Sequence, residues 1–345
     1  MATKGKGYIT FRDINSGTLP DGTIDKEIVE LCAKENPALE DVLWKECRQG
    51  REDIVTQRTG IPEAVFRAFY EGVQGSKSSK KQVTNSCGTV STAVRFDARL
   101  YDSHPDKAQF LMDEVEQHGE AMGQGAATAL FYGDVSTNPK GINGFAKTFG
   151  QTAAADSDED EAAFYALNGS RASGASASKL RSVFIVGWGK KSAHGIYPQG
   201  TSVGMQKGKL EFPYLPDEDD ATKLLRTGVQ EMNWDIGLNI RDFRYCGRIA
   251  NLELDLGFGT TGNPDYVELL QRLTCRVKQS AGVTTRLYMS RLTFELFATH
   301  FYRKTMGNAV KYADLEQRIT GSLMGIPVGL CDAMNVNEAF VNPKA

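Results

Sequence analysis

The sequence lacks the features that mark membrane, secreted and nucleic-acid-binding proteins. Its longest strongly apolar stretch, Val183 to Trp188, is far shorter than the ~20 residues that a membrane-spanning helix needs, and residues 1–9 have no apolar core of a signal peptide. Its 40 basic and 43 acidic residues give a formal charge of −3 without long basic runs, so tight DNA binding by the folded surface is not expected. We therefore expect a soluble chain, made for a cytoplasm, that does not contact a membrane.

Metal-binding and disulfide frameworks are also missing. The cysteines are too sparse for a disulfide scaffold and include no C-x-x-C pair, so we expect reduced thiols that pack in the interior. They stand at positions 32, 47, 87, 246, 275 and 331. The four histidines are scattered and form no H-E-x-x-H motif. The sequence predicts no metal ion and no cofactor.

The composition is that of a globular protein. Apolar residues make up 41% and charged residues 24% of the 345 positions, which is enough for a sizeable core in two or three structural units. The 35 glycines predict many tight backbone positions. Because strands and helices alternate without a regular βαβ order, the pattern favours an α+β fold over an α/β fold.

The first 50 residues have the character of an arm. A helical pattern covers 24–33, and a short amphipathic turn is expected at 39–47. The apolar residues of this segment do not suffice for a core. The arm therefore needs an apolar partner surface in the same subunit or in another one.

Residues 51–103 predict a long hairpin. Strands are expected at 56–60 and 90–96, and the centre between them, 71–85, has turn and linker residues with almost no apolar content. This combination predicts a mobile, polar tip.

One long helix is expected at 106–132. Ser103 and Asp106 form a capping-box-like start, and Gly133 ends the pattern of apolar and small residues. The helix would be roughly 40 Å long. Three glycines within it indicate close packing on one side or a bend, namely Gly119, Gly123 and Gly125.

The second half alternates strands and helices. A Ser-, Ala-, Gly- and Asp-rich stretch at 153–178 is expected to be a solvated loop or a short helix. Strands are predicted at 182–188, 209–214, 236–256, 285–289 and 327–331, and helices at 266–279 and 292–301.

Two glycine motifs raise the alternative of an enzyme. Gly257, Gly259 and Gly262 match the G-x-G-x-x-G fingerprint between a predicted strand and a predicted helix, so a nucleotide-binding oxidoreductase is the alternative function. Against it, Asn263-Pro264 delays the helix, and the next strand ends without the acidic residue that would hold a ribose.

A second motif, Gly200-Thr-Ser-Val-Gly204, matches a nucleophile elbow, but Pro198 and the residues that follow do not fit a strand-to-helix turn. His300 is the sole histidine downstream of it. The acidic run at 156–161 lacks the spacing of a calcium loop and is expected to be a solvated face. We assign no catalytic, cofactor-binding or metal-binding residue, and the chain is not expected to be an enzyme.

Several blocks, in this order and spacing, resemble major capsid proteins of tailed bacteriophages, particularly short-tailed ones. The blocks are Phe131-Tyr-Gly-Asp134, Asn138-Pro-Lys-Gly141, Gly144-Phe145, Gly237-Leu-Asn-Ile-Arg-Asp-Phe-Arg-Tyr245, Arg248-Ile-Ala-Asn251, Thr285-Arg-Leu-Tyr-Met289, Gly325-Ile-Pro-Val328 and Cys331-Asp-Ala333. The resemblance runs from about residue 40 to residue 340.

The resemblance implies the tailed-phage capsid fold, also called the Hong Kong 97-type fold. Its parts would be an N-terminal arm at 1–50, an extended E-loop at 51–103, the spine helix of a peripheral domain at 104–133, a mainly axial domain at 134–325 with an inserted β region near 195–250, and a return to the peripheral domain at 326–345.

The resemblance also implies a function. The chain would be a structural subunit that assembles with copies of itself, as pentamers and hexamers, into an icosahedral head. The head would enclose double-stranded DNA without sequence-specific contact, and scaffolding, portal and cement proteins are potential partners. The protein would reside in the virion after assembly in the host bacterial cytoplasm.

Some members of this fold join their subunits covalently through an E-loop lysine and a neighbour's asparagine. Here Lys77, Lys80 and Lys81 crowd the predicted loop tip. Such a bond needs a desolvated lysine and a carboxylate that accepts its proton, and no motif in the sequence identifies the asparagine or the carboxylate. We predict non-covalent locking.

Overall fold

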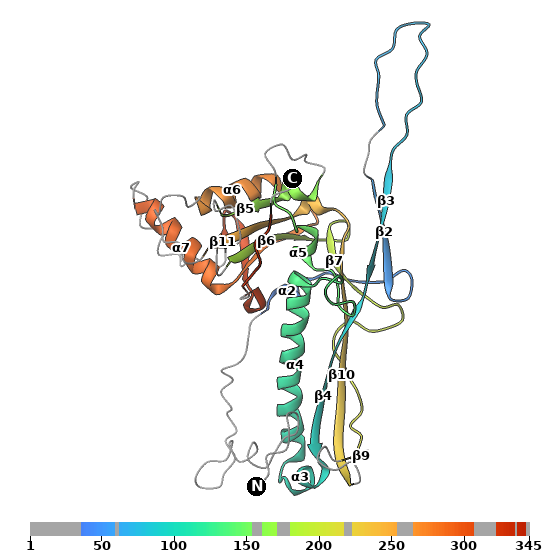
Figure 1. Ribbon diagram of the computed structural model, residues 1–345, viewed down its shortest axis with the longest axis vertical. Coiled ribbons are helices and arrows are strands. Elements are labelled where there is room, and N and C mark those ends of the chain that lie inside the picture. The colour runs from blue at the N-terminus through green and yellow to red at the C-terminus, as the bar shows by residue number, and fades with distance from the viewer. Residues whose placement is uncertain are drawn as a thin grey trace. The chain divides into compact units, whose positions relative to one another are not determined.

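The computed structural model is an α+β protein, as the sequence predicts (Figure 1). It describes residues 36–58, 62–153, 161–170, 180–216, 223–253, 265–306, 322–334 and 337–342. The described residues fall into two compact units. The smaller comprises Thr89–Ala126 and Ser202–Asp235, and the larger comprises Glu35–Gly88, Ala127–Thr201 and Ile236–Ala345.

The larger unit is built on a mixed sheet centred on β6 (Leu180–Trp188). This strand pairs antiparallel with β11 (Cys246–Glu253) on one side and with β12 (Thr284–Met289) on the other. Beyond these two strands, β5 (Ala166–Asn168) pairs parallel with β11, and β14 (Ile326–Leu330) pairs parallel with β12. Every residue of β6 and of β11 is buried, which fits the apolar run Val183–Trp188 that makes up most of β6.

The sheet continues through β7 (Ala193–Tyr197). β7 pairs parallel with β1 (Trp44–Glu46) and antiparallel with the last four residues of β10 (Leu224–Ile240). The N-terminal segment is therefore incorporated into the sheet of the larger unit. Short elements complete this unit: α2 (Ala38–Asp41), α5 (Phe145–Thr148), η1 (Ala162–Tyr165), η2 (Phe243–Tyr245), β13 (Ser322–Leu323) and η3 (Asp332–Met334).

Two helices close the core of the larger unit. α6 (Tyr266–Arg276) is capped by Asp265, whose side chain accepts hydrogen bonds from the backbone N–H groups of Val267 and Glu268. Its apolar face and Phe297 of α7 (Arg291–Met306) are buried in the same core as β6. Aromatic rings fill the centre of this core: Phe131, Phe145, Phe184, Trp188 and Tyr288.

The smaller unit combines helix and strand. β4 (Gly88–Asp97) lies next to β10 in the sheet order, and β8 (Gln206–Lys207) and β9 (Tyr214–Pro216) pair antiparallel with β10. The helix α3 (Ala98–Ser103) follows β4. The buried core consists of Val94, Phe96, Phe110, Val115, Met122 and Met232.

The long helix predicted at 106–132 is confirmed as α4 (Lys107–Tyr132). Its cap differs from the prediction. Asp106 caps the helix, because its Oδ1 accepts from the backbone N–H of Gln109 at 3.1 Å. The hydroxyl of Ser103 instead donates to the carbonyl of Leu100 at the end of α3.

The glycines of α4 differ in their surroundings. A Cβ added at Gly119 would lie 3.3 Å from Cε of Met205, which is a tight approach. One at Gly125 would lie 3.8 Å from Cγ1 of Val90, an ordinary van der Waals contact, and one at Gly123 would meet nothing within 4 Å. Of the three glycines, close packing is therefore found at Gly119 alone.

The expected hairpin exists, but its second strand lies elsewhere. β2 (Glu52–Arg58) pairs antiparallel with β3 (Lys80–Ser86), in a register from Glu52 opposite Ser86 to Arg58 opposite Lys80. The strand predicted at 90–96 is β4, which belongs to the smaller unit. β3 was missed because Lys-Lys-Gln-Val-Thr-Asn-Ser carries one apolar residue, and it is half-exposed or exposed throughout.

Three more predictions need correction. The amphipathic turn predicted at 39–47 divides into α2 and the strand β1. The strand predicted at 209–214 forms mainly an isolated bridge at Glu211. The strand predicted at 236–256 is two strands, separated by η2. Asp242 causes the last break, because its side chain caps η2 by accepting from the backbone N–H of Arg244. The strands β6, β12 and β14 and the helices α6 and α7 are confirmed within a few residues.

Candidate assembly surfaces

The base of the hairpin is fastened to the end of β10. Asp53 of β2 is 2% exposed, and its Oδ2 accepts from Nδ2 of Asn239 at 2.6 Å. Asn85 of β3 donates from Nδ2 to Oδ1 of the same Asn239 at 3.2 Å. Further along β2, Nε2 of Gln57 donates to the carbonyls of Ile240 and Arg241 at 3.3 Å. Both strands are thus held by the body of the larger unit near their base.

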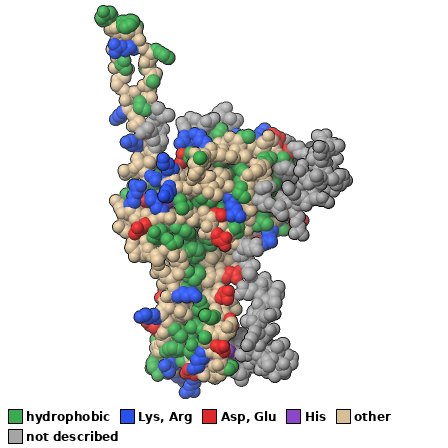
Figure 2. Space-filling model, turned by 180° about the vertical axis from the view of Figure 1, so that it is seen from behind, with side chains coloured by type: hydrophobic (Ala, Val, Ile, Leu, Met, Phe, Trp, Pro, Cys, Tyr) green, Lys and Arg blue, Asp and Glu red, His purple; other side chains and the backbone are tan. Residues whose placement is uncertain are grey.

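Beyond these bonds the hairpin carries a group of exposed apolar side chains, here called the apolar tip. Figure 2 shows green side chains gathered at the far end of the hairpin. The exposed fractions are those of side chains with almost no neighbours: Val65 64%, Phe66 104%, Phe69 95%, Tyr70 105% and Val73 59%. Five large apolar residues so placed exceed what an isolated surface normally shows.

Sequence reasoning expected a polar tip and missed this group. The expectation came from 71–85, whereas the apolar residues lie just before it. Their positions repeat at intervals of three and four, which is an amphipathic pattern that could have been found in the sequence. The segment 62–68 has no regular secondary structure, and Tyr70 has a φ of 67°, a rare conformation for a bulky residue.

The three lysines considered for cross-linking lie on the returning side of the hairpin. Lys80 and Lys81 belong to β3, opposite Arg58 and Gln57, and Lys77 precedes that strand. All three are exposed. Within the part of the chain that the structure describes, none of the three forms an ion pair with a carboxylate. The desolvated lysine that covalent chemistry needs is therefore not seen among them.

A buried histidine lies under basic residues near the hairpin base. His194 of β7 is fully buried, and neither ring nitrogen has a protein partner among the described residues. Burial, together with the nearby charges of Lys45 and Arg241 and against an opposing effect of Asp53, lowers its pKa to about 4. Imidazole is neutral here over a wide pH range.

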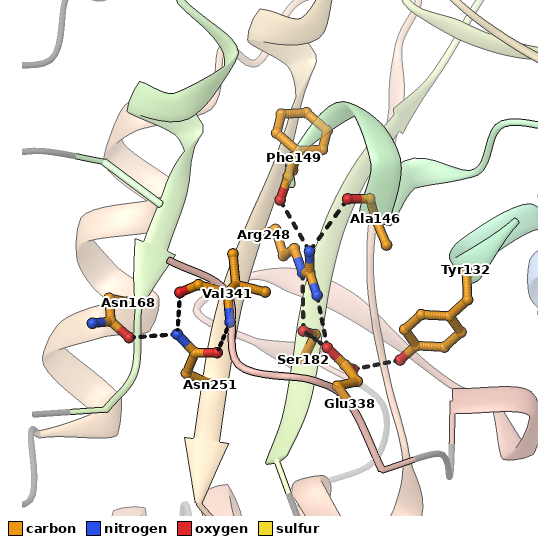
Figure 3. A network of polar contacts seen from close by, with 9 residues as sticks. All are labelled: Tyr132, Ala146, Phe149, Asn168, Ser182, Arg248, Asn251, Glu338 and Val341. Atoms are coloured by element: carbon orange, nitrogen blue, oxygen red, sulfur yellow. Dashed lines mark hydrogen bonds and ion pairs between the residues drawn. The ribbon is translucent and has the colours of Figure 1, made fainter. Parts of the chain in front are cut away.

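The C-terminal segment is clamped to the sheet through Glu338 (Figure 3). Its Oε2 accepts from Nη2 of Arg248 at 2.7 Å and from the hydroxyl of Ser182 at 2.5 Å. Its Oε1 accepts from the hydroxyl of Tyr132 at 2.7 Å. Burial, together with the charge of Glu338, raises the pKa of Tyr132 well above its ordinary value. A single carboxylate thus joins the end of α4, β6, β11 and the C-terminal segment.

Arg248 uses its remaining donors on backbone carbonyls. Nη1 donates to the carbonyl of Phe149 at 3.0 Å and to that of Ala146 at 3.4 Å, and Nε donates to Ser182. A second clamp lies nearby, where Asn251 exchanges two 2.8 Å hydrogen bonds with the backbone of Val341. The return of the chain after 337 is therefore fixed by the hydrogen bonds of Arg248 and Asn251.

The N-terminal segment is fixed in a similar way. Asp41 of α2 accepts from Nη1 of Arg286 at 2.5 and 2.7 Å and from the hydroxyl of Tyr288 at 2.6 Å. Tyr288 also accepts from Nε1 of Trp188 at 2.7 Å. Ala38 and Val42 are buried. The partner surface that the arm was expected to need lies, for residues 36–47, within the same subunit.

The enzyme motifs gain no structural support. Gly257, Gly259 and Gly262 lie outside the described residues. After β7 the chain turns at Gly200, which has a φ of 79°, and the next element is the short strand β8 rather than a helix, so the geometry of a nucleophile elbow is not formed around Ser202. The side chain of His300 is not described.

The described part of the chain holds no cluster of three or more His, Cys, Asp or Glu residues that could bind a metal ion. Among the described helices, none has the length and apolarity to cross a bilayer.

Comparison with solved structures identifies the fold. A chain in the structure of bacteriophage epsilon15 aligns over 100% of this chain and 100% of its own length, with a TM-score of 0.78 and 23% sequence identity. The capsid of a native GTA particle aligns over 66% of this chain and 95% of its own length, with a TM-score of 0.43 and 8% sequence identity. The SrpI encapsulin of Synechococcus elongatus PCC 7942 aligns over 72% of this chain and 98% of its own length, with a TM-score of 0.43 and 10% sequence identity. The match to the epsilon15 structure shows that the chain has the fold of tailed-phage capsid subunits.

The family follows from the sequence. The model of the major capsid protein GP7 family matches residues 19–342, and the chain belongs to that family. It is a structural subunit of a phage capsid, which confirms the resemblance noted in the sequence. A search of curated protein sequences found no match. None of these comparisons supports a nucleotide-binding oxidoreductase.

Proposed function

We propose that this subunit assembles with copies of itself, as pentamers and hexamers, into an icosahedral head that encloses double-stranded DNA. One observation carries the proposal: the apolar tip projects from a hairpin whose base is rigidly fastened. Full burial of a side chain such as Phe66 contributes about 1.5–3 kcal/mol. Five such side chains exposed to water favour docking on an apolar surface of a neighbouring copy.

The parts of the subunit follow from this assignment. Residues 1–50 act as the N-terminal arm, 51–103 contain the extended E-loop, and 104–133 contain the spine helix. Residues 134–325 contribute mainly to the axial domain, with an inserted β region near 195–250, and 326–345 return to the peripheral domain. Bonds such as Glu338–Arg248 and Asp41–Arg286 support the proposal, because they hold both ends of the described chain to one body from which the hairpin extends.

Assembly takes place in the host bacterial cytoplasm, and the protein is then carried in the virion. Scaffolding, portal and cement proteins are proposed partners. DNA contacts are proposed to lack sequence specificity, and they should be weak, because the formal charge of −3 gives no overall attraction to phosphate.

The test is to change the apolar tip and follow assembly. A variant with Val65, Phe66, Phe69, Tyr70 and Val73 replaced by Ser should fold with little change in stability, since these side chains are 59–105% exposed in the described structure. Its yield of particles in electron microscopy and sedimentation velocity should fall at least about tenfold, as expected for the loss of more than 1.4 kcal/mol per contact. The control variant, Gln74→Ser with Lys77→Ser, changes the same exposed segment and should assemble normally.

Two results would contradict the proposal. Normal particle yield from the five-residue variant would show that the tip does not dock. Monomers that never form particles, even with the other head proteins co-expressed, and that bind NAD would favour the oxidoreductase instead. Deletion of residues 2–35 tests the arm separately: a folded but poorly assembling body is expected, and normal particles would refute an assembly role for the arm.

A further inference from the structure

Two cysteines meet at the base of the hairpin. The Sγ atoms of Cys47 and Cys87 lie 3.4 Å apart, although 40 positions separate the residues in the sequence. Neither sulfur is in a disulfide. The chain between them contains the whole β2–β3 hairpin with its apolar tip, so this contact lies where the loop of the hairpin closes.

Both cysteines have a fixed backbone. The N–H of Cys47, directly after β1, donates to the carbonyl of Tyr197 at 2.9 Å, and the N–H of Cys87, between β3 and β4, donates to the carbonyl of Arg51 at 2.9 Å. The thiol of Cys87 also packs over β10, because a Cβ added at Gly237 would lie 3.2 Å from its Sγ. The two sulfur atoms are therefore held next to each other by the fold and do not meet by chance motion.

The two thiols differ in access. Cys47 is buried, with 2% of its surface exposed, whereas Cys87 is half-buried. Of the described cysteines, Cys246 and Cys331 are buried and Cys275 is exposed, and no sulfur–sulfur contact involves any of these three. Proximity to a second sulfur thus distinguishes the pair from the other described thiols.

We propose that Cys47 and Cys87 form an intrachain disulfide when the protein meets a low-molecular-weight disulfide such as oxidised glutathione. The thiolate of Cys87, the more accessible residue, attacks one sulfur of the oxidant, and the glutathione that leaves takes up a proton. The thiolate of Cys47 then attacks the sulfur of Cys87 and expels the second glutathione, which is also protonated. Two protein thiols are oxidised, and one glutathione disulfide is reduced to two thiols.

The reaction fits a protein that leaves a reducing cytoplasm. The disulfide would close the hairpin at its base and leave the apolar tip unchanged. It does not depend on shell assembly, because both residues belong to one subunit. Burial raises the pKa of the Cys47 thiol above its ordinary value, so the second step should be faster at mildly alkaline than at neutral pH.

The test uses the purified full chain in glutathione buffers of increasing oxidised fraction. Remaining thiols are blocked with N-ethylmaleimide under denaturing conditions, and digested peptides are identified by mass spectrometry. The peptides of Cys47 and Cys87 should be recovered joined, with the loss of two hydrogens and no added glutathione, whereas Cys275 should carry glutathione. The proposal would be overturned if Cys47 and Cys87 both carried N-ethylmaleimide under conditions in which Cys275 carries glutathione. It would also be overturned if Cys47 and Cys87 each carried a glutathione of their own.

Matched variants separate the two steps. Cys47→Ser should trap Cys87 as its mixed disulfide with glutathione, since the resolving thiol is gone. Cys87→Ser should leave Cys47 unmodified in the folded protein, and Cys275→Ser should leave the Cys47–Cys87 link unaffected. A Cys47→Ser protein in which Cys87 takes up no glutathione would contradict the assigned order of attack. The assay uses the free subunit, so a missing disulfide would not count against the proposed assembly into a shell. In the same way, a defect in assembly would not count against the disulfide.

Discussion

Arg248 and Glu338, 90 positions apart in the sequence, form an ion pair inside the protein. Their Nη2–Oε2 distance is 2.7 Å, and their side chains are 4% and 6% exposed. Removing one partner of a buried pair is expected to destabilise the fold by about 3–5 kcal/mol, because the other charge stays buried without compensation. Arg248→Ala and Glu338→Ala should each lower the free energy of unfolding by an amount in this range, measured by urea denaturation of the free subunit.

The double variant Arg248→Ala with Glu338→Ala is the informative control. It removes both charges, so its loss of stability should be smaller than the sum of the two single losses. Glu338→Gln should be milder than Glu338→Ala, since an amide oxygen still accepts from Tyr132. Losses that simply add in the double variant would indicate that the two charges do not interact.

His194 should make stability depend on pH. In the folded state its pKa is lowered to about 4 by burial, whereas the unfolded chain has a value near 6.5. Below about pH 6.5 the unfolded chain therefore binds a proton that the folded chain does not bind. Stability should fall as the pH decreases from about 6.5 to about 4, by about 3 kcal/mol from this residue, and then level off.

His194→Leu isolates this contribution, because it removes the titrating ring at a position where no protein partner is lost among the described residues. Relative to the unmodified chain, the variant should gain stability progressively as the pH falls through this window. The same difference between variant and unmodified chain at every pH would show that His194 does not titrate as its burial requires.

Assembled particles should contain no covalent links between subunits. Lys77, Lys80 and Lys81 are exposed to solvent, whereas a lysine that forms a covalent bond must be desolvated. Particles that are boiled with a reducing agent should run on a denaturing gel as one band near the 37.8 kDa monomer. A ladder of multimers that disappears in a Lys77→Arg, Lys80→Arg, Lys81→Arg variant would show that one of these lysines reacts.

The elements that the sequence predicts correctly are those with a strong local pattern. The helix α4 repeats apolar and small residues over 26 positions, and β6 contains the apolar run Val183–Trp188. β3 and β1 have no such pattern, because each is a strand through pairing with a distant segment: β1 pairs with β7, about 150 positions away. Pairing of this kind depends on the whole fold and is not encoded in a local window.

The assembly surfaces divide in the same way. The apolar tip could have been predicted, since Phe66, Phe69 and Tyr70 are close together in the sequence and need only their spacing to be noticed. The contacts Cys47–Cys87 and Arg248–Glu338 could not, because residues 40 and 90 positions apart meet only after the sheet has formed. The family resemblance gave the fold class but carries no information on such pairs.

Gly123 within α4 and Gly133 directly after it differ in the space that they leave for a methyl group. A Cβ at Gly123 would meet nothing within 4 Å, and glycine inside a helix is less stable than alanine by about 0.5–1 kcal/mol. Gly123→Ala should therefore raise the free energy of unfolding of the free subunit by this amount. At Gly133, directly after the helix, a Cβ would lie 2.4 Å from the carbonyl oxygens of both Ala129 and Ile142, so Gly133→Ala should destabilise the fold.

Urea denaturation of Gly123→Ala, Gly133→Ala and the unmodified chain gives their free energies of unfolding. The comparison separates the effect of helix propensity from the effect of steric packing. The expected shifts have opposite signs for the same chemical change, because the Gly123 site has room for a methyl group and the Gly133 site is bounded by backbone that cannot rotate away. Gly119→Ala should fall between them, since its nearest neighbour is the flexible end of Met205 at 3.3 Å. A loss of stability in Gly123→Ala would mean that this face of α4 is already in contact with other residues in the free subunit.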